Sequence, residues 1–294
     1  MIAGILVSYE PEAQTLNATF VTLLSQVDHL FLVDNGSSID PADLLDLKSE
    51  ERLTIIRLDE NLGIAAAQNV GIAAAREMGA DFVVLSDQDT VYPQGAISQL
   101  IDVFERWPKA AAVVPLFNDV NKSSSDGFIL ETSLFFSPTR LVGGEHSLLQ
   151  AIASGKVVRL SAMEEIGAMD EDLFIDWVDL EWCWRARHNG YQVIGSGDVE
   201  ITHTLGDSAR SIGYRDVNLR SPVRHYYITR NGLSLALRTP YLTLLMRCIL
   251  FVRSLRYPLA FPILSRPRWR NFCAVAAGIT DALLGRLGKT NRVL

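Results

Sequence analysis

Residues 53–89 read LTIIRLDENLGIAAAQNVGIAAAREMGADFVVLSDQD and contain a strand, a helix and a second strand in that order. Leu53–Leu58 and Asp81–Ser86 are short runs of mainly branched apolar residues, which predicts two buried strands. Between them, Gly63–Met78 has the alanine-rich periodicity of a helix, and Gly79 follows as a stop signal. This order defines a βαβ unit, and such a unit predicts a parallel sheet.

The sequence on either side of this unit continues the alternation of strands and helices. The expected strands cover residues 2–8, 29–33, 111–115, 127–137, 193–195 and 200–202, and the expected helices cover residues 11–25, 95–106 and 179–188. A helix-like segment is expected at 164–169, and a polar loop at 118–126. The strands lack strict polar alternation, which is typical of a sheet covered on both faces. We therefore predict an α/β fold with a Rossmann-like, mostly parallel central sheet and helices on both faces.

The C-terminal part of the chain differs in character from the rest. The 294 residues are enough for one large α/β domain, here placed at residues 1–235, and a C-terminal segment at residues 236–294. The apolar run at Tyr241–Leu264 is interrupted by three arginines, which makes it a poor transmembrane span. The composition predicts amphipathic helices that lie on a membrane surface or form a contact in a homo-oligomer.

Charge is distributed unevenly along the chain. The net charge is −7, but from Leu205 to the end there are 15 basic and three acidic residues, against 12 basic and 31 acidic residues before that point. A basic segment rich in apolar residues attracts an anionic membrane surface or a phosphate-bearing substrate, although a solvated basic face has the same composition. The acidic N-terminal part argues against a partner that is a nucleic acid.

Cysteine usage and the N-terminus indicate the compartment. The three cysteines are far apart and show neither a disulfide framework nor metal-ligand spacing, which suits a reducing environment. The N-terminal run MIAGILVSYEP lacks the basic leader and cleavage site of a signal peptide, so we expect a cytoplasmic protein. Neither a GxGxxG nor a Walker A motif is present, which argues against a dinucleotide fingerprint site and a P-loop.

Polar residues follow three of the expected strands. Ser8 and Tyr9 follow the first strand, Asp34 the second, and the sequence Asp87-Gln88-Asp89 the strand at 81–86. Ligands of open α/β sheets bind outside the carboxyl ends of the strands, so these residues are expected to converge on one crevice. Asp34 could bind a ribose hydroxyl, and the paired carboxylates could address a divalent metal and a diphosphate. Each of these clusters is also typical of a plain turn.

The start of the central helix provides a second group of candidates. Asn61 and Gly63 precede a run of small residues that permits close approach to the sheet or to a ligand. Asn69 is disfavoured by propensity in the middle of a helix, so it could bond a neighbouring backbone group or a nucleotide. A tightly packed, alanine-rich core helix explains the same pattern.

The segment Asp170–Arg185 is the most informative one. Six acids lie between Asp170 and Glu181, among three tryptophans. If a helix starts near Asp179, Trp182 lies on the same face three residues later, and a carboxylate beside an aromatic wall can act as a general base. An amphipathic helix start with acids favoured by the helix dipole is the alternative. Farther on, His203 follows a strand, where it is either structural or completes a metal site.

Taken in this order, these motifs resemble the inverting GT-A glycosyltransferases of family 2, most closely their rhamnosyltransferase branch. The resemblance covers roughly residues 2–235. The matching pieces are VSYEP, VDNGS, NLGIAAAQNVGI, SDQD, FIDWVDLEWCWRA, HTLG and RHYYITRN, of which the last three are the most specific.

The resemblance implies a role for each candidate residue. Asp34 would contact the nucleoside and Asp87 the ribose or diphosphate, and the donor site would also include Ser8, Tyr9, Asn61, Gly63 and Asn69. Asp89 would bind Mg²⁺ or Mn²⁺, with His203 as a ligand of the metal or diphosphate. Asp179 falls at the position of the general base. Many relatives have Glu-Asp there, whereas this chain has Val178-Asp179 with Asp176 upstream, so Asp176 remains a second candidate.

The resemblance also implies a reaction. The enzyme would transfer L-rhamnose from dTDP-β-L-rhamnose, with inversion, to a saccharide or lipid-linked saccharide of a bacterial surface polysaccharide such as O-antigen. It would work at the inner face of the plasma membrane. The alternatives are another UDP-, GDP- or dTDP-sugar donor, a non-catalytic nucleotide-sugar-binding scaffold, and a membrane-surface module driven by the basic C-terminal segment.

Overall fold

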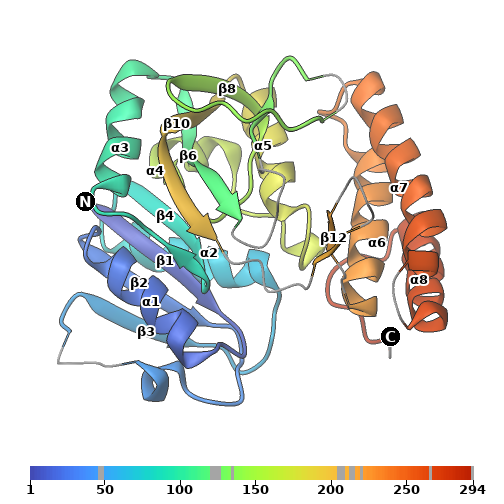
Figure 1. Ribbon diagram of the computed structural model, residues 1–294, viewed down its shortest axis with the longest axis horizontal. Helices are drawn as coiled ribbons and strands as arrows, with labels where there is room; N and C mark the ends of the chain where they lie inside the picture. The colour runs from blue at the N-terminus through green and yellow to red at the C-terminus, as the bar shows by residue number, and fades with distance from the viewer. Residues whose placement is uncertain are drawn as a thin grey trace.

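The computed structural model describes residues 1–45, 50–119, 127–133, 136–203, 209–211, 216–218, 221–264 and 267–292. Figure 1 shows a central sheet with helices packed around it and three C-terminal helices that stand together at one side. The strands of the sheet follow the order β3-β2-β1-β4-β9-β6-β10-β8-β7, and β5 pairs with β10.

The N-terminal half of the sheet is parallel, as predicted. Its strands are β1 (Ile2–Ser8), β2 (His29–Asp34), β3 (Leu53–Arg57) and β4 (Phe82–Asp87). Successive side chains of β1 enter different cores: Ile5 packs in one cluster and Leu6 in the other. This alternation follows from the two-residue period of a strand, and it places helices on both faces.

Different helices cover the two faces of the sheet. One core contains apolar residues of α1 (Ala13–Leu24) and α3 (Ala96–Arg106). The other contains residues of α2 (Ile64–Glu77), α4 (Leu160–Ile166) and α5 (Val178–His188). The helix-like segment expected at 164–169 corresponds to α4, which begins earlier, at Leu160. It is followed by Gly167 as its C-cap, whose φ of 96° suits a glycine at the end of a helix.

The second half of the sheet is mixed rather than parallel. It contains β5 (Thr90–Val91), β6 (Ala110–Asp119), β7 (Ile129–Leu130), β8 (Glu145–Gln150), β9 (Lys156–Arg159) and β10 (Gln192–His203). The strand β9 lies antiparallel between β4 and β6, so the parallel order of the N-terminal half does not continue across the sheet. The two short strands expected at 193–195 and 200–202 are parts of β10, which has an irregularity between Ser196 and Glu200.

Two predictions around residues 111–137 are wrong. Asn118 and Asp119 extend β6 instead of starting a loop, because their backbone pairs with Thr202 and His203 of β10; the rest of the expected loop, 120–126, lies outside the described residues. Among the described residues of the strand expected at 127–137, only Ile129–Leu130 forms a strand, β7, because the chain turns after Leu130, where the Ser133 amide bonds back to the Leu130 carbonyl.

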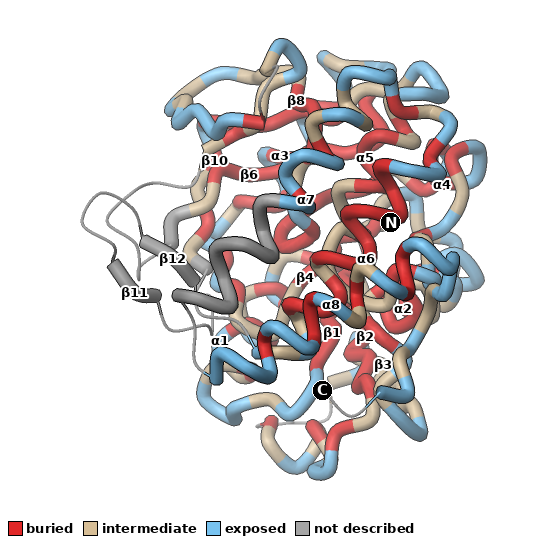
Figure 2. Tube along the Cα trace, turned by 90° about the vertical axis from the view of Figure 1, so that its right-hand side faces the viewer, coloured by how far each residue is buried: buried red, intermediate tan, exposed pale blue. Residues whose placement is uncertain are grey.

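The C-terminal helices are α6 (Pro222–Arg238), α7 (Leu244–Leu264) and α8 (Arg268–Leu284). The shorter elements are β11 (Ala209–Ser211), β12 (Asp216–Asn218) and the 3₁₀ helices Pro41–Leu44 and Glu171–Leu173. Helix α6 is largely buried and continues past residue 235, where the first domain was expected to end. Figure 2, which faces this side of the molecule, shows exposed stretches along α7 and α8. Within the described part of the chain, no helix has both the length and the apolar character needed to cross a membrane.

Candidate active site

The carboxyl ends of the parallel strands bring several candidate residues together. In the pairing register, Ser8 lies beside Asp34 and Val7 lies beside Asp87. The turn after β4 is held by α1, because the Thr19 hydroxyl donates to the Gln88 carbonyl at 2.9 Å and accepts from the Thr90 amide at 3.1 Å. These contacts hold the turn after β4 in place at the carboxyl ends of the parallel strands.

Asp34 is fully buried and organises the turn that follows β2. Ser37 Oγ donates to its Oδ1 at 2.5 Å, and the Ser37 amide donates to its Oδ2 at 3.2 Å. Ser8 Oγ lies 3.4 Å from Oδ1, and the Arg57 guanidinium lies 3.5 Å from Oδ2. The carboxylate thus has the turn-holding role that its sequence context also allowed, and its contact with a nucleoside stays a prediction.

Tyr9 reaches the neighbouring strand end through Gln88. The Tyr9 amide donates to Gln88 Oε1 at 2.8 Å, while the Tyr9 side chain is exposed. Sequence reasoning assigned no role to Gln88, although it stands between the two carboxylates of the Asp87-Gln88-Asp89 motif. Its amide joins the ends of β1 and β4.

Asn61 and Gly63 form the entry to α2. Asn61 Oδ1 accepts from the Gly63 amide at 2.9 Å and from the Asn35 side chain at 3.2 Å. Gly63 has a φ of 91°, and a Cβ atom there would lie 2.5 Å from the carbonyl oxygen of Phe174. The Ile64 amide donates to that same oxygen at 2.8 Å. The start of α2 therefore lies directly against the loop that precedes α5.

Asn69 uses its amide on the protein itself. Its Nδ2 donates to the Met169 carbonyl at 3.0 Å and to Glu171 Oε1 at 2.8 Å, and its Oδ1 accepts from the Met169 amide at 2.9 Å. These bonds favour the first of the two roles considered above, attachment of neighbouring backbone. They explain why an asparagine is retained in the middle of a helix.

Asp87 and Asp89 flank the turn between β4 and β5. Ser154, which is fully buried, donates its hydroxyl hydrogen bond to Asp87 Oδ2. Burial raises the pKa of the Tyr92 hydroxyl, and the charges of Asp87 and Asp89 add to the rise, so both carboxylates act on this ring. Ser154 gave no signal in the sequence, because it lies 67 residues from its partner.

His203 lies on the strand next to this turn. The antiparallel pairing of β10 with β5 places His203 opposite Thr90, the residue that follows Asp89. The side chain of His203 lies outside the described part of the structure. Among the side chains that are described, no three potential ligands gather into a metal site.

Asp179 lies in the first turn of α5 and is half-buried. Burial raises the pKa of its carboxyl; the Lys156 ammonium opposes this rise, and the negative charge of Asp87 adds to it. Asp179 and Asp87 therefore lie near enough to repel each other. A carboxylate whose pKa is raised is a stronger base than an ordinary aspartate, which suits the role of a general base.

Lys156 is a site residue that sequence reasoning missed. It is fully buried under the first turn of α5, and its Nζ donates to the carbonyls of Ala151 at 3.1 Å and Asp179 at 3.3 Å. Its only sequence signal was a lysine at the start of the apolar run KVVR. A buried cation near the Asp179 carboxyl favours its charged form.

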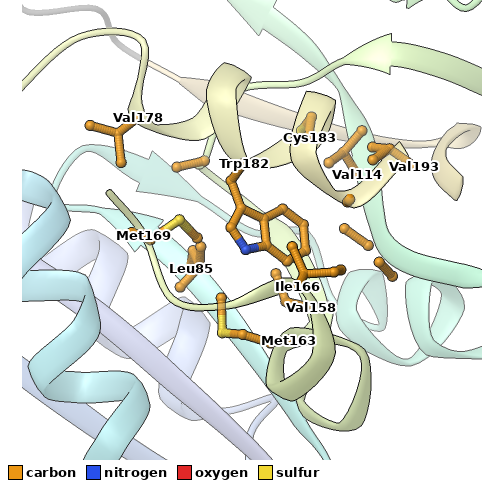
Figure 3. Packing of buried hydrophobic residues seen from close by; sticks show 14 of the residues in the cluster. Leu85, Val114, Val158, Met163, Ile166, Met169, Val178, Trp182, Cys183 and Val193 are labelled. Carbon is orange, nitrogen blue, oxygen red and sulfur yellow. The ribbon is translucent and has the colours of Figure 1, made fainter. Parts of the chain in front are cut away.

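The expected aromatic wall beside Asp179 is wrong. Trp182 is fully buried, and its indole nitrogen donates to the Gly167 carbonyl at 3.0 Å. Figure 3 shows the indole packed among Leu85, Val158 and Met163 in the core between α5 and the sheet. The indole fills the space between α5 and the sheet, so it forms no open wall beside Asp179.

Asp176, the second candidate base, is bound by an arginine. Arg224 Nη2 lies 2.7 Å from Asp176 Oδ1, and Nε lies 3.4 Å from Oδ2. An acceptor hydroxyl would have to compete with this two-point ion pair for the carboxylate. The geometry therefore favours Asp179 over Asp176 as the group that faces an acceptor.

The chain is similar in sequence to known glycosyltransferases. Residues 5–167 match the sequence profile of Glycosyl transferase family 2. The chain is 33% identical over 248 residues to the dTDP-rhamnosyl transferase RfbF of Shigella flexneri, covering 83% of this chain and 82% of that protein. It is 23% identical over 208 residues to the N-acetylglucosaminyl-diphospho-decaprenol L-rhamnosyltransferase of Mycobacterium tuberculosis, covering 59% of this chain and 66% of that protein.

A solved structure shows the same fold. The mannosyltransferase PcManGT from Pyrobaculum calidifontis, in complex with GDP-Man and Mn²⁺, superposes with a TM-score of 0.56 at 16% identity, over 96% of this chain and 75% of that one. The predicted fold class, a GT-A scaffold with additional C-terminal helices, is confirmed. The chain belongs to Glycosyl transferase family 2 and is a glycosyltransferase.

Proposed function

We propose that this enzyme transfers L-rhamnose from dTDP-β-L-rhamnose to a saccharide or lipid-linked saccharide acceptor, with inversion, in the synthesis of a bacterial surface polysaccharide. The donor is supported by the 33% identity to a dTDP-rhamnosyl transferase over most of both chains. The observation that carries the chemistry is the half-buried Asp179, whose pKa is raised by burial and which lies close to Asp87 at the strand ends.

In this reaction Asp179 is the general base. The acceptor hydroxyl gives its proton to the Asp179 carboxylate, and its oxygen attacks the anomeric carbon from the face opposite the diphosphate. The bond between that carbon and the diphosphate oxygen breaks, dTDP leaves with the electron pair, and the configuration inverts. The Lys156 ammonium, buried beneath the first turn of α5, favours the charged form of Asp179, which is the form that accepts a proton.

The donor side of the site is assigned to the strand ends. Asp34, Ser8 and Tyr9 would bind the nucleoside, and Asn61 and Gly63 would line the entry to α2 beside it. Asp87 would contact the ribose or diphosphate.

A divalent cation fits the remaining residues. Asp89 and His203 would hold Mg²⁺ or Mn²⁺, because carboxylate oxygens and an imidazole nitrogen are suitable ligands and the strand pairing places His203 next to the Asp89 turn. When bound, the ion would neutralise charge on the departing diphosphate. The structural relative with GDP-Man and Mn²⁺ supports a divalent ion in this fold.

The donor assignment is tested by a thermal-shift screen over dTDP-, UDP- and GDP-sugars with Mg²⁺ or Mn²⁺, followed by donor hydrolysis. We expect dTDP-rhamnose to raise the melting temperature most, because a ligand of the native state stabilises it. We also expect slow release of dTDP, since transferases pass sugar to water. Stronger stabilisation by another nucleotide sugar would change the donor assignment. Donor binding without any turnover would favour a non-catalytic nucleotide-sugar-binding scaffold.

We further propose that α7 and α8 dock on an anionic membrane, which would place the enzyme at the inner face of the plasma membrane. Trp269 and Phe272 are both exposed, at 74% and 53%, and their rings stack 5.7 Å apart at the start of α8. Arg268 and Arg270 flank them. Residues 221–294 contain 12 basic residues and one acid. Aromatic residues beside cations are typical of helices that lie in the membrane interface.

Membrane docking is tested with point substitutions, because deleting α7 and α8 would uncover buried residues of α6 such as Thr229, which packs against Gly278 of α8. The double variant Trp269→Ser/Phe272→Ser should lose co-sedimentation with vesicles that contain phosphatidylglycerol, while the wild type binds them more weakly as salt rises. Val21→Ser, an exposed apolar residue on α1, is the control. If the double variant still binds vesicles but has a smaller mass in solution than the wild type, the surface around Trp269 and Phe272 contacts a second copy of the chain instead.

A further inference from the structure

The loop between the 3₁₀ helix Glu171–Leu173 and α5 has an unusual backbone. Phe174, Asp176 and Trp177 have φ values of 64°, 61° and 73°, although none of them is glycine. Non-glycine residues rarely adopt positive φ, and a loop with three such residues persists only where its surroundings hold it in place. Trp177 is the N-cap residue of α5, so this loop determines where the first turn of α5, with Asp179, is placed.

A buried amide on α6 binds this loop. Asn231 is fully buried, and its Nδ2 donates to the carbonyl oxygens of Leu173 at 2.8 Å, Ile175 at 2.9 Å and Asp176 at 3.1 Å. The two hydrogens of one amide are thus shared among three backbone acceptors of a strained segment. Without it, those carbonyls would be buried and lack this donor.

The neighbouring arginine orients that amide and extends the contact. Arg230, also fully buried, donates from Nε to Asn231 Oδ1 at 2.8 Å, which points the Asn231 NH₂ group toward the loop. Its Nη2 donates to the carbonyls of Asp172 at 3.0 Å and Leu173 at 3.1 Å. The planar guanidinium can make these bonds simultaneously, which a lysine could not.

Other contacts join the same helix to the same loop. Trp177 Nε1 donates to the Ile228 carbonyl at 3.1 Å, and the Phe174 ring stacks on Tyr227 at a centroid distance of 4.8 Å. On the opposite side, the Phe174 carbonyl accepts from the Ile64 amide at the start of α2. The loop is therefore held between α6 and α2.

We infer that Arg230 and Asn231 are positioning residues for sugar transfer: they hold the loop 172–177 so that Asp179 faces the acceptor. The C-terminal helix α6 is then part of the catalytic unit. This inference rests on the proposed function, since it assumes that Asp179 is the base. If this inference is correct, the rate of transfer depends on α6, whereas donor binding depends on the residues at the strand ends.

The test compares two variants of the same helix. Asn231→Leu keeps the branched shape of the side chain and removes the amide donors, whereas Leu233→Ala removes buried apolar contacts one half-turn later without touching the polar cluster. For each we would measure the melting temperature, the dissociation constant for dTDP-rhamnose and kcat. We expect Asn231→Leu to lower kcat on the order of 10²-fold, because a shift of about 1 Å at a catalytic group costs that much. Donor affinity should stay within about twofold, and Leu233→Ala, assayed well below its melting temperature, should keep its kcat.

A second variant and a second measurement keep the inference testable if Asn231→Leu does not fold. Asn231→Ser retains one hydroxyl donor and should show an intermediate kcat. Amide hydrogen exchange over residues 173–180 should be faster in the Asn231 variants than in Leu233→Ala, because their loop opens more often.

Three outcomes separate the inference from the function on which it rests. Equal kcat in the Asn231 variants and Leu233→Ala, with Asp179→Asn slow, would overturn the inference alone. Wild-type turnover in Asp179→Asn would overturn both the base assignment and the inference. A fall in donor affinity that equals the fall in kcat/KM would show that Asn231 supports the donor site, and it would also overturn the positioning role.

Discussion

Replacing Gly63 with alanine should slow sugar transfer by displacing the loop that carries Phe174. The new Cβ atom would lie 2.5 Å from the Phe174 carbonyl oxygen, whereas ordinary van der Waals contact begins at 3.4 Å, so the loop must move by about 0.9 Å. The loop is continuous with the start of α5, so this displacement reaches Asp179. A misplacement of about 1 Å can cost on the order of 10² in rate.

The same substitution should also lower stability. Gly63 has a φ of 91° and a ψ of 163°, a region essentially restricted to glycine, so alanine there costs about 1–3 kcal/mol in strain. Losing the hydrogen bond between the Ile64 amide and the Phe174 carbonyl adds about 0.5–1.5 kcal/mol. The expected fall in the free energy of unfolding is therefore roughly 1.5–4.5 kcal/mol.

The other end of α2 provides the control. Gly79 has a φ of 82°, and a Cβ atom there would meet nothing within 4 Å. Gly79→Ala should therefore carry a backbone penalty but leave kcat unchanged. The assay measures urea unfolding, donor affinity and kcat for both variants. Equal kcat in Gly63→Ala and Gly79→Ala would refute the argument that close approach at Gly63 positions the loop. A loss of donor affinity alone would instead assign Gly63 to the nucleotide.

Four further predictions concern the site and its core. Asp179→Asn should bind donor normally but transfer sugar about 10²–10⁴-fold more slowly, while Asp176→Asn should retain more activity; steady-state kinetics of the pair with donor titration decides between them. Asp89→Ala should lose metal-dependent donor binding in calorimetry with the fold intact, and unchanged affinity would contradict the metal assignment. Asp179 must be ionised to act, so its raised pKa makes kcat fall on acidification at a higher pH than an ordinary aspartate would; Lys156→Met, which removes the opposing charge, should move that limb to still higher pH. Trp182→Ala should lower the free energy of unfolding by about 3–5 kcal/mol in urea titration, and a smaller loss would show that the core around α5 collapses to fill the space.

Local pattern was sufficient to predict the N-terminal half of this fold. The runs at Ile2–Ser8, His29–Val33 and Asp81–Ser86 form parallel strands because each is long enough and apolar enough to be buried. The alanine-rich helix α2, between β3 and β4, provides the crossover that a parallel pair of strands requires. Since parallel strands end at the same edge of a sheet, the sequence also determined that Ser8, Asp34 and Asp87 would lie together. These inferences use periods of two to four residues, which the sequence displays directly.

Only the tertiary structure decided how the site is completed. Ser154 reaches Asp87 across 67 positions, Lys156 lies under Asp179 across 23, and Asn231 binds the loop at Leu173 across 58. Trp182 shares a helix with Asp179 but faces the core, because packing against the sheet sets the rotation of α5. A hydrogen bond between distant residues leaves no periodic trace in the sequence. It forms because burial of a carboxylate, a cation or a backbone carbonyl requires a partner, and the folded chain determines which residue is close enough to supply one.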